Sequence, residues 1–213
     1  MTLKAIVWDL DGTLIDSKDD IADAVNAMLR RLALPERDPR VIHGFIGEGA
    51  QQLLGKSLGP AHEERIDEAL PLWREEYARR KLCKTRLYPG IPELLRRPER
   101  HTVLTNKPGG FAREILAGLK VLDAFEVVTG GDEMPRKPAP DGLIEQLREL
   151  RLPKEEALLI GDSTVDLATA RAAGVRFCAV TWGLGERAAL APADYICDDA
   201  GALGALLGRL TGA

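Results

Sequence analysis

The sequence predicts an α/β protein with a parallel β-sheet and a helical segment inserted after the first strand. Two observations support this prediction. From about residue 90 to the end, short apolar runs alternate with helical patterns. Continuous apolar runs are typical of strands that are covered on both faces, as in a parallel sheet. Residues 16–86, which follow the first apolar run, show helical patterns only.

The predicted strands are short and uncharged at most positions. They are residues 5–8, 102–105, 125–128, 157–160 and 177–180. Helical stripes lie between them, and the predicted helices cover 111–119, 143–150 and 162–173, the last with Gly174 as its C-cap. Because parallel strands joined by a helix form right-handed units, we expect a right-handed α/β sheet.

The inserted segment is predicted as a helical cap over residues 16–86, with residues 1–15 and 87–213 forming the sheet domain. One amphipathic stripe runs from Ile21 to Leu32, with Ser17 as a possible N-cap. A second stripe runs from Ile66 to Tyr77 and contains Pro71, which predicts a kink or two shorter helices. The hinges are expected near residues 14–18 and 85–89.

Composition narrows the classes of function. The formal net charge is −4, which argues against a nucleic-acid-binding surface, because phosphate backbones require a basic stripe. No apolar run approaches the roughly 20 residues of a membrane span, and acid follows too soon after the N-terminus for a signal peptide. The 3 cysteines form no C-x-x-C pair. We therefore expect a reduced, cytoplasmic protein. The expected assembly is a monomer or a homodimer.

Acidic residues mark the end of the first predicted strand. Asp9 and Asp11 lie on one side of the chain where that strand stops, and Gly12 permits a sharp turn after them. Ligands of open α/β sheets bind beyond the carboxyl ends of the strands. Two crowded carboxylates repel each other unless a cation or a shared proton intervenes, and Mg²⁺ prefers oxygen ligands. An acidic turn without chemistry is the alternative for this motif alone.

Polar residues follow the other predicted strands too. Thr105 and Asn106 follow the second strand and can bind an anionic oxygen, and Lys137 with Pro138 follows the third. Asp162 follows the fourth strand, and Asp166 lies in the first turn of the next helix. Each of these is also compatible with a turn, a solvated loop or a helix cap. Together they form a series of acid pair, threonine, lysine and acid pair at successive strand ends.

This order and spacing resemble the haloacid dehalogenase-like hydrolase superfamily, whose core is a Rossmann-like sheet. The forms D-L-D-G-T-L at 9–14 and G-D-S-x-x-D at 161–166 are specific, and the resemblance covers essentially the whole chain, helical cap included. Asp9 and Asp11 match the first motif of the family, Thr105 the second, Lys137 the third, and Asp162 with Asp166 the fourth. Dehalogenases lack the second acid of the first motif, so Asp11 favours phosphoryl transfer.

The resemblance implies a mechanism for these residues. Asp9 would attack phosphorus and form an aspartyl-phosphate, and Asp11 would protonate the leaving oxygen and then activate water. Thr105 and Lys137 would hold the phosphoryl oxygens with help from the Asn106 amide. Mg²⁺ would be bound by Asp9, Asp162 and the backbone carbonyl of Asp11, with Asp166 in or near that shell. Mg²⁺ and lysine would offset the repulsion between a carboxylate and a phosphate.

The expected substrate is a small phosphate monoester selected by the cap. The stretches T-N-K-P at 105–108, G-G-D at 130–132, R-K-P-x-P at 136–140 and T-W-G-L-G at 181–185 resemble those of phosphoglycolate phosphatases and near relatives. In the cap, Gly47, Glu48 and Gly49 precede a short helical pattern at 51–58 whose N-terminus could face an anion. Glu48 opposes that interpretation, and a simple turn between helices is the alternative.

Other functions stay open at this point. Within enzymes, they are a pyrophosphatase, a sugar phosphatase and a phosphomutase of the same superfamily. Outside enzymes, a receiver-like phosphoacceptor also places acids, threonine and lysine around a phosphoryl site, but it is shorter and has no helical insert. A catalytically inactive binding module is the third possibility, and the complete set of acids, threonine and lysine argues against it.

Overall fold

The computed structural model describes residues 2–212 and contains a parallel sheet of the predicted kind. Its strand order is β5-β4-β1-β6-β7-β8, and every neighbouring pair is parallel. The strands are β1 (Ala5–Trp8), β4 (Arg100–Leu104), β5 (Val127–Thr129), β6 (Ala157–Gly161), β7 (Arg176–Val180) and β8 (Tyr195–Cys197). The five predicted strands are confirmed. The edge strand β8 was not predicted, because it is only three residues long and one of them, Ile196, is exposed.

Helices cover both faces of the sheet, which explains the continuous apolar strands. Along β1, Ile6 and Trp8 pack into one apolar cluster, whereas Val7 packs into the other. The second cluster is completed by α7 (Asp141–Leu150) and α8 (Thr164–Ala173). The helices that follow the insertion are α5 (Ile91–Leu94), α6 (Gly109–Gly118), α7 (Asp141–Leu150), α8 (Thr164–Ala173) and α9 (Ala200–Thr211), with 3₁₀ turns η2 (Leu122–Ala124), η3 (Lys154–Glu156) and η4 (Arg187–Leu190). Gly174 caps α8 in the left-handed conformation, as predicted.

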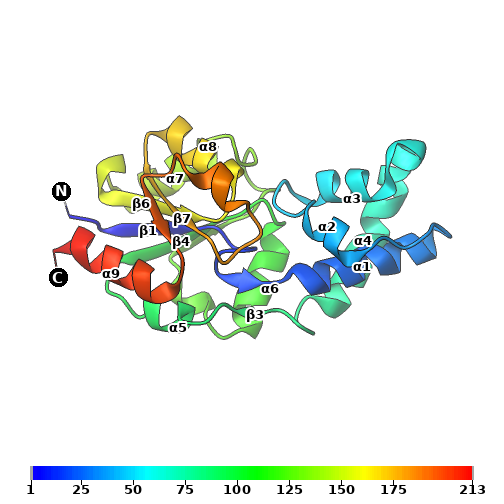
Figure 1. Ribbon diagram of the computed structural model, residues 1–213, viewed down its shortest axis with the longest axis horizontal. Helices are drawn as coiled ribbons and strands as arrows, with labels where there is room; N and C mark the ends of the chain where they lie inside the picture. Colours follow the sequence, from blue (N-terminus) through cyan, green and yellow to red (C-terminus); the bar gives the residue numbers. More distant parts are fainter. Residues whose placement is uncertain (1, 213) are drawn as a thin grey trace.

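Figure 1 shows the inserted segment at one end of the molecule and both chain termini at the other. The segment consists of α1 (Lys18–Arg31), α2 (Pro39–His43), α3 (Ala50–Leu58), the 3₁₀ turn η1 (Pro60–Arg65) and α4 (Ile66–Arg80). Of the two outcomes expected around Pro71, two shorter helices are wrong, since α4 continues as one helix across it, and a kink stays a prediction. Ser17 stands at the N-cap position of α1 but makes no capping bond, because its hydroxyl donates to Asp11 instead.

The two chain crossings into the inserted segment lie side by side. Strand β2 (Ile15–Asp16) pairs antiparallel with β3 (Arg86–Leu87). The fully buried carboxylate of Asp20, in the first turn of α1, accepts hydrogen bonds from the backbone amides of Lys84 and Thr85 and from the Thr85 hydroxyl. The start of α1 is therefore tied to the second crossing.

The inserted segment also packs on α6 of the sheet domain. The ring of Phe111 makes edge contacts with Trp73 and Tyr77, at centroid distances of 6.1 and 5.1 Å. Lys81 forms an ion pair of 2.9 Å with Glu114. One apolar cluster continues from the sheet into α1, α3 and α4. This packing holds the helices of the insertion over the carboxyl ends of β1 and β4.

Candidate active site

The predicted site residues gather at the carboxyl edge of the sheet. Asp9 directly follows β1, Thr105 follows β4, and Asp162 follows β6. Because β1 lies between β4 and β6, and Trp8 is in register with both Val103 and Ile160, these strand ends are level. Lys137 reaches the same place from the loop between β5 and α7.

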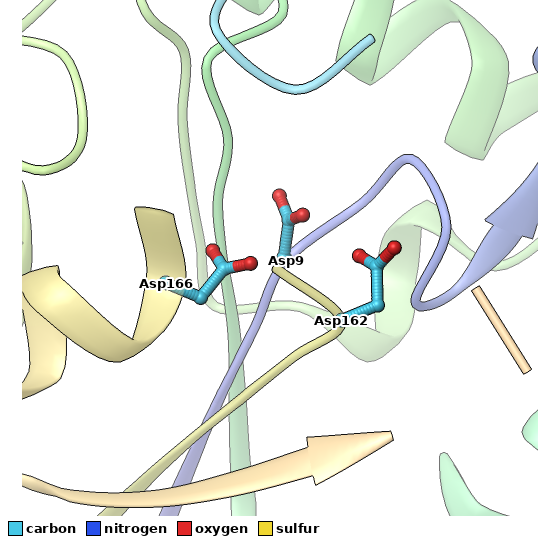
Figure 2. A group of neighbouring side chains, drawn as sticks. All are labelled: Asp9, Asp162 and Asp166. Carbon is cyan, nitrogen blue, oxygen red and sulfur yellow. The ribbon is translucent and has the colours of Figure 1, made fainter. Parts of the chain in front are cut away.

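Three buried carboxylates form the centre of the site. The side chains of Asp9, Asp162 and Asp166 lie next to one another in Figure 2, and ligand oxygens from all three lie within 4.8 Å of one another. The ammonium group of Lys137 lies 2.6 Å from Oδ1 of Asp9 and 2.6 Å from Oδ1 of Asp166. One buried lysine therefore faces two of the three acids.

The electrostatics of this cluster favour additional positive charge. Burial raises the pKa of Asp9 well above its ordinary value, and the charge of Asp166 raises it further, against the opposing effect of Lys137. Burial, together with the charge of Asp166, raises the pKa of Asp162 to about 6. Burial alone would lower the pKa of Lys137, but the charges of Asp166 and Asp9 outweigh it and raise the pKa. Lys137 thus stays protonated while the carboxylates repel one another.

Local hydrogen bonds fix the direction of Asp162. Its carboxylate accepts the Thr13 hydroxyl at 3.1 Å and the Leu184 backbone amide at 2.7 Å. Gly12, with φ of +87°, lies against the same carboxylate, and a Cβ at this position would collide with it. The turn predicted after Asp11 is therefore both left-handed and too crowded for any other residue.

Asp166 combines two roles that the sequence left as alternatives. It completes a capping box with Ser163 at the start of α8, accepting the Ser163 backbone amide through Oδ2. Its Oδ1 faces Lys137 and belongs to the acidic cluster. The helix cap therefore holds the Asp166 carboxylate beside those of Asp9 and Asp162.

Asp11 lies apart from the three clustered carboxylates. Its Oδ1 accepts the Ser17 hydroxyl, and its Oδ2 lies 2.8 Å from Nζ of Lys107. Its side chain is not part of the metal-ligating group found among residues 2–212. The metal-binding role expected for this residue concerns its backbone carbonyl and stays a prediction.

Thr105 and Asn106 connect the strand end to neighbouring loops. The Thr105 hydroxyl accepts the backbone amide of Lys107 at 3.2 Å. The side-chain amide of Asn106 donates to the carbonyl oxygens of Gly47 and Lys137, each at 3.0 Å. Asn106 therefore joins the inserted segment to the loop that carries the lysine.

A cavity lies between the two parts of the chain, directly over Asp9 and Asp11. Gly47 and Gly49 line it from the inserted segment, and Thr105 and Asn106 line it from the sheet. A second cavity, on the Asp162 side, is also lined by Asp9, Asp11 and Gly47. Glu48 lines neither of these cavities. Its carboxylate lies 3.0 Å from Nζ of Lys56 in α3.

The structure adds site residues that the sequence analysis did not assign. Lys107 is buried between Asp11 and Tyr77, whose hydroxyl lies 2.9 Å from its Nζ. Its place in T-N-K-P, next to two predicted site residues, was the available signal. Tyr77 belongs to a helical stripe that was interpreted as core, and no local pattern marks it as part of a site. Thr13 lies within the first acidic motif, but no role was predicted for it.

The acidic cluster fits a hard divalent cation. Three buried carboxylates that share one small space supply the oxygen ligands that Mg²⁺ prefers. Burial first, and then the charge of Asp166, raises the pKa of Asp9 and of Asp162, and a bound cation would favour the charged form of both carboxylates. Asp9, Asp162 and Asp166 are therefore the side chains that could hold such an ion.

Comparisons with known proteins agree with this geometry. The family model described as haloacid dehalogenase-like hydrolase matches residues 6–180. A phosphoglycolate phosphatase of Nitrosospira multiformis is 34% identical over 87% of this chain and 86% of its own length. One from Rhodospirillum rubrum is 36% identical over 96% of this chain and 91% of its own length.

Solved structures share the fold over the whole chain. A predicted phosphoglycolate phosphatase of Haemophilus somnus superposes with a TM-score of 0.89 at 27% identity, covering 97% of this chain and 98% of its own. A haloacid dehalogenase-like hydrolase of Streptococcus pneumoniae gives a TM-score of 0.86 at 30% identity, covering 96% and 98%. Within residues 2–212, no helix has the length and apolar character needed to cross a membrane.

Proposed function

The chain belongs to the haloacid dehalogenase-like hydrolase family and is a phosphoric monoester hydrolase, and from this premise we propose that it is a Mg²⁺-dependent phosphoglycolate phosphatase. The observation that supports the proposal best is the arrangement around Asp9: a buried carboxylate at a strand end, in contact with Lys137 and next to two further acids. Asp11, two residues on, is held separately by Ser17 and Lys107.

Asp9 acts as the nucleophile in this proposal. A carboxylate oxygen of Asp9 forms a bond to phosphorus while the bond to the leaving oxygen breaks, and Asp11 gives that oxygen its proton. In the second step, Asp11 takes a proton from water as the water oxygen attacks phosphorus, which releases phosphate and restores Asp9. Thr105, the backbone amide of Asn106 and Lys137 hold the phosphoryl oxygens.

Mg²⁺ is the proposed cofactor, held by Asp9, Asp162 and Asp166 together with the backbone carbonyl of Asp11. When bound, it offsets the negative charge that otherwise separates a carboxylate from a phosphate group. Lys137 supplies a further positive charge, and because this side chain is buried its effect is larger than in water.

The helical segment 16–86 is proposed to act as a cap over the sheet domain formed by 1–15 and 87–213. The paired strands β2 and β3 provide both crossings, so the cap can move as a unit. Gly47 and Gly49 line the substrate cavity from this side, whereas Glu48 supports the loop through Lys56. A cytoplasmic location is in keeping with the three free cysteines. The assembly stays a prediction, a monomer or a homodimer.

The test is phosphate release with a panel of esters. Phosphoglycolate, p-nitrophenyl phosphate, pyrophosphate and sugar phosphates are compared with Mg²⁺ and with EDTA. We expect phosphoglycolate to give the highest kcat/KM, EDTA to abolish turnover and Mg²⁺ to restore it. Asp9→Asn should unfold at nearly the wild-type temperature and lose at least about 10³-fold in kcat, because an amide cannot form the acyl-phosphate. Substantial turnover by Asp9→Asn would rule out the covalent route.

A further inference from the structure

We propose that the cap side of the cavity over Asp9 is a carboxylate-binding site, in which the indole N–H of Trp73 and the amino end of α3 hold an anionic leaving group. The inference rests on the proposed function and specifies its substrate class. The substrates would be small phosphate esters whose leaving alcohol carries a carboxylate, as phosphoglycolate does.

Trp73 supplies an unused hydrogen-bond donor. Its side chain lines the cavity and is only 2% exposed, yet its Nε1 has no hydrogen-bond partner among the described residues. The ring is held by stacking on Tyr77, at 5.1 Å and an interplanar angle of 8°, and by the edge contact with Phe111. A buried N–H without an acceptor is costly, and buried donors are almost always paired. An acceptor on the ligand would satisfy it.

The amino end of α3 supplies further donors at the same cavity. Gly49, the N-cap residue, and Ala50, the first residue of the helix, both line it. Gly49 has no side chain to cap the first amides, its φ is +94°, and the first turn of α3 contains no acidic residue. An uncapped helix start offers backbone N–H groups and the positive end of the helix dipole to an anion. Glu48, which opposed this interpretation in the sequence, pairs with Lys56.

The remaining walls define the size and charge of the ligand. Ile21, Ile46 and Leu53 are apolar, and Lys107 adds a positive charge from the sheet side. The volume open to the centre of a water molecule is about 40 Å³, room for roughly three waters, which suits a two- or three-carbon group. Asp9 and Asp11 belong to the phosphoryl end and would repel a carboxylate on the leaving group, so that carboxylate is favoured at the cap end. A small carboxylate meets these conditions.

The first test removes the N–H and keeps an aromatic ring. Trp73→Phe is compared with the wild type on phosphoglycolate and on ethyl phosphate. Both esters have two carbons, but ethyl phosphate has a methyl group in place of the carboxylate. We expect kcat/KM for phosphoglycolate to fall about tenfold, as for loss of one hydrogen bond to a charged group, and the value for ethyl phosphate to stay within about twofold. Equal losses on both esters, or no loss on either, would overturn the proposal.

A second test places charge at the helix start. Ala50→Asp and Ala50→Asn differ by one charge at nearly the same volume, and an acid in the first turn of a helix is otherwise favourable. The preference is the ratio of kcat/KM for phosphoglycolate to kcat/KM for ethyl phosphate. We expect this ratio to be about tenfold lower in Ala50→Asp than in Ala50→Asn. Equal preferences in the two variants would show that no anion binds at this end.

Failure of the site and failure of the proposed function give different results. If the wild type hydrolyses ethyl phosphate or p-nitrophenyl phosphate but shows no preference for phosphoglycolate, the carboxylate site is wrong and the phosphatase stands. If no ester is hydrolysed, the proposed function fails. The site is then judged by ligand binding, since a bound ligand raises the melting temperature. The site is supported if phosphoglycolate raises the melting temperature of the wild type more than ethyl phosphate does, and if Trp73→Phe abolishes this difference. Equal increases with the two esters would overturn it.

Discussion

The ammonium group of Lys107 lies 2.8 Å from Oδ2 of Asp11, the proposed acid and base of the reaction. The same nitrogen lies 2.9 Å from the hydroxyl of Tyr77 and 4.8 Å from the centre of its ring. A lysine of the sheet domain thus links the reacting end of the site to a helix of the inserted segment. Asp11 is held in place by this contact and by the hydroxyl of Ser17.

Lys107→Met should lower kcat by roughly ten- to a hundredfold, because Asp11 loses a charged hydrogen-bond partner and its fixed position. The Mg²⁺ concentration for half activity should change little, since Lys107 does not contact the three clustered carboxylates. Steady-state kinetics over a Mg²⁺ series measures both quantities. Lys4→Met is the control, because Lys4 forms a half-exposed ion pair with Glu156 at the opposite end of β1. A fully active Lys107→Met would contradict the positioning role.

Asp162 should make the metal-free protein less stable as the pH rises. Its folded-state pKa of about 6 lies above the ordinary aspartate value of 3.8, so the folded protein binds more protons between these values. The Asp162 contribution to stability is therefore present below about pH 4 and is lost as the pH rises through 6. The melting temperatures of Asp162→Asn and the wild type are measured in EDTA at pH 4.5 and at pH 7. We expect the melting temperature of the variant, taken relative to that of the wild type, to be higher at pH 7 than at pH 4.5. The same difference at both pH values would exclude a raised pKa.

The same variant tests the metal assignment at constant pH. Asn keeps the volume of Asp162 but carries no charge, so Asp162→Asn should raise the Mg²⁺ concentration needed for half activity by about tenfold or more. An unchanged Mg²⁺ requirement would remove Asp162 from the ligand set.

Replacing Asp20 should lower the free energy of unfolding much more than replacing an exposed acidic residue. Asp20→Ala leaves the amides of Lys84 and Thr85 and the Thr85 hydroxyl without their buried acceptor, which should cost about 2 to 4 kcal/mol in the free energy of unfolding. Asp23→Ala removes only an exposed ion pair with Lys84, which solvent screens, and should change the free energy of unfolding much less. Urea unfolding measures both. Equal losses would show that Asp20 does not hold the two crossings together.

Gly47 should affect substrate discrimination more than metal binding. Its φ is +120°, where side chains are strained, and its carbonyl accepts the Asn106 amide at 3.0 Å. Gly47→Ala should therefore lower kcat/KM for phosphoglycolate more than for p-nitrophenyl phosphate, with the Mg²⁺ requirement unchanged. Gly55→Ala in α3, where a Cβ meets no atom within 4 Å, is the matched control. Equal falls on both esters would mean that the loop is only a structural turn.

The sequence by itself determined five of the six strands of the sheet and the residues at their ends. Apolar runs such as Ala157–Ile160 are covered on both faces, so a local pattern was sufficient to predict them. In a parallel sheet, the carboxyl ends of neighbouring strands meet at one edge. Asp9, Thr105 and Asp162, far apart in the chain, therefore had to come together once the strands were identified.

Only the tertiary structure decided how the inserted segment contacts the site. Ser17 was an ordinary N-cap candidate in the sequence, and its contact with Asp11 depends on how the chain turns between β1 and α1. Trp73 and Tyr77 lie on an apolar stripe that any buried helix would show. The packing of α4 over Phe111 determines where their N–H and O–H groups lie, and it brings the hydroxyl of Tyr77 to Lys107. Contacts between segments distant in sequence leave no periodic pattern, because each depends on the orientation of two packed elements at once.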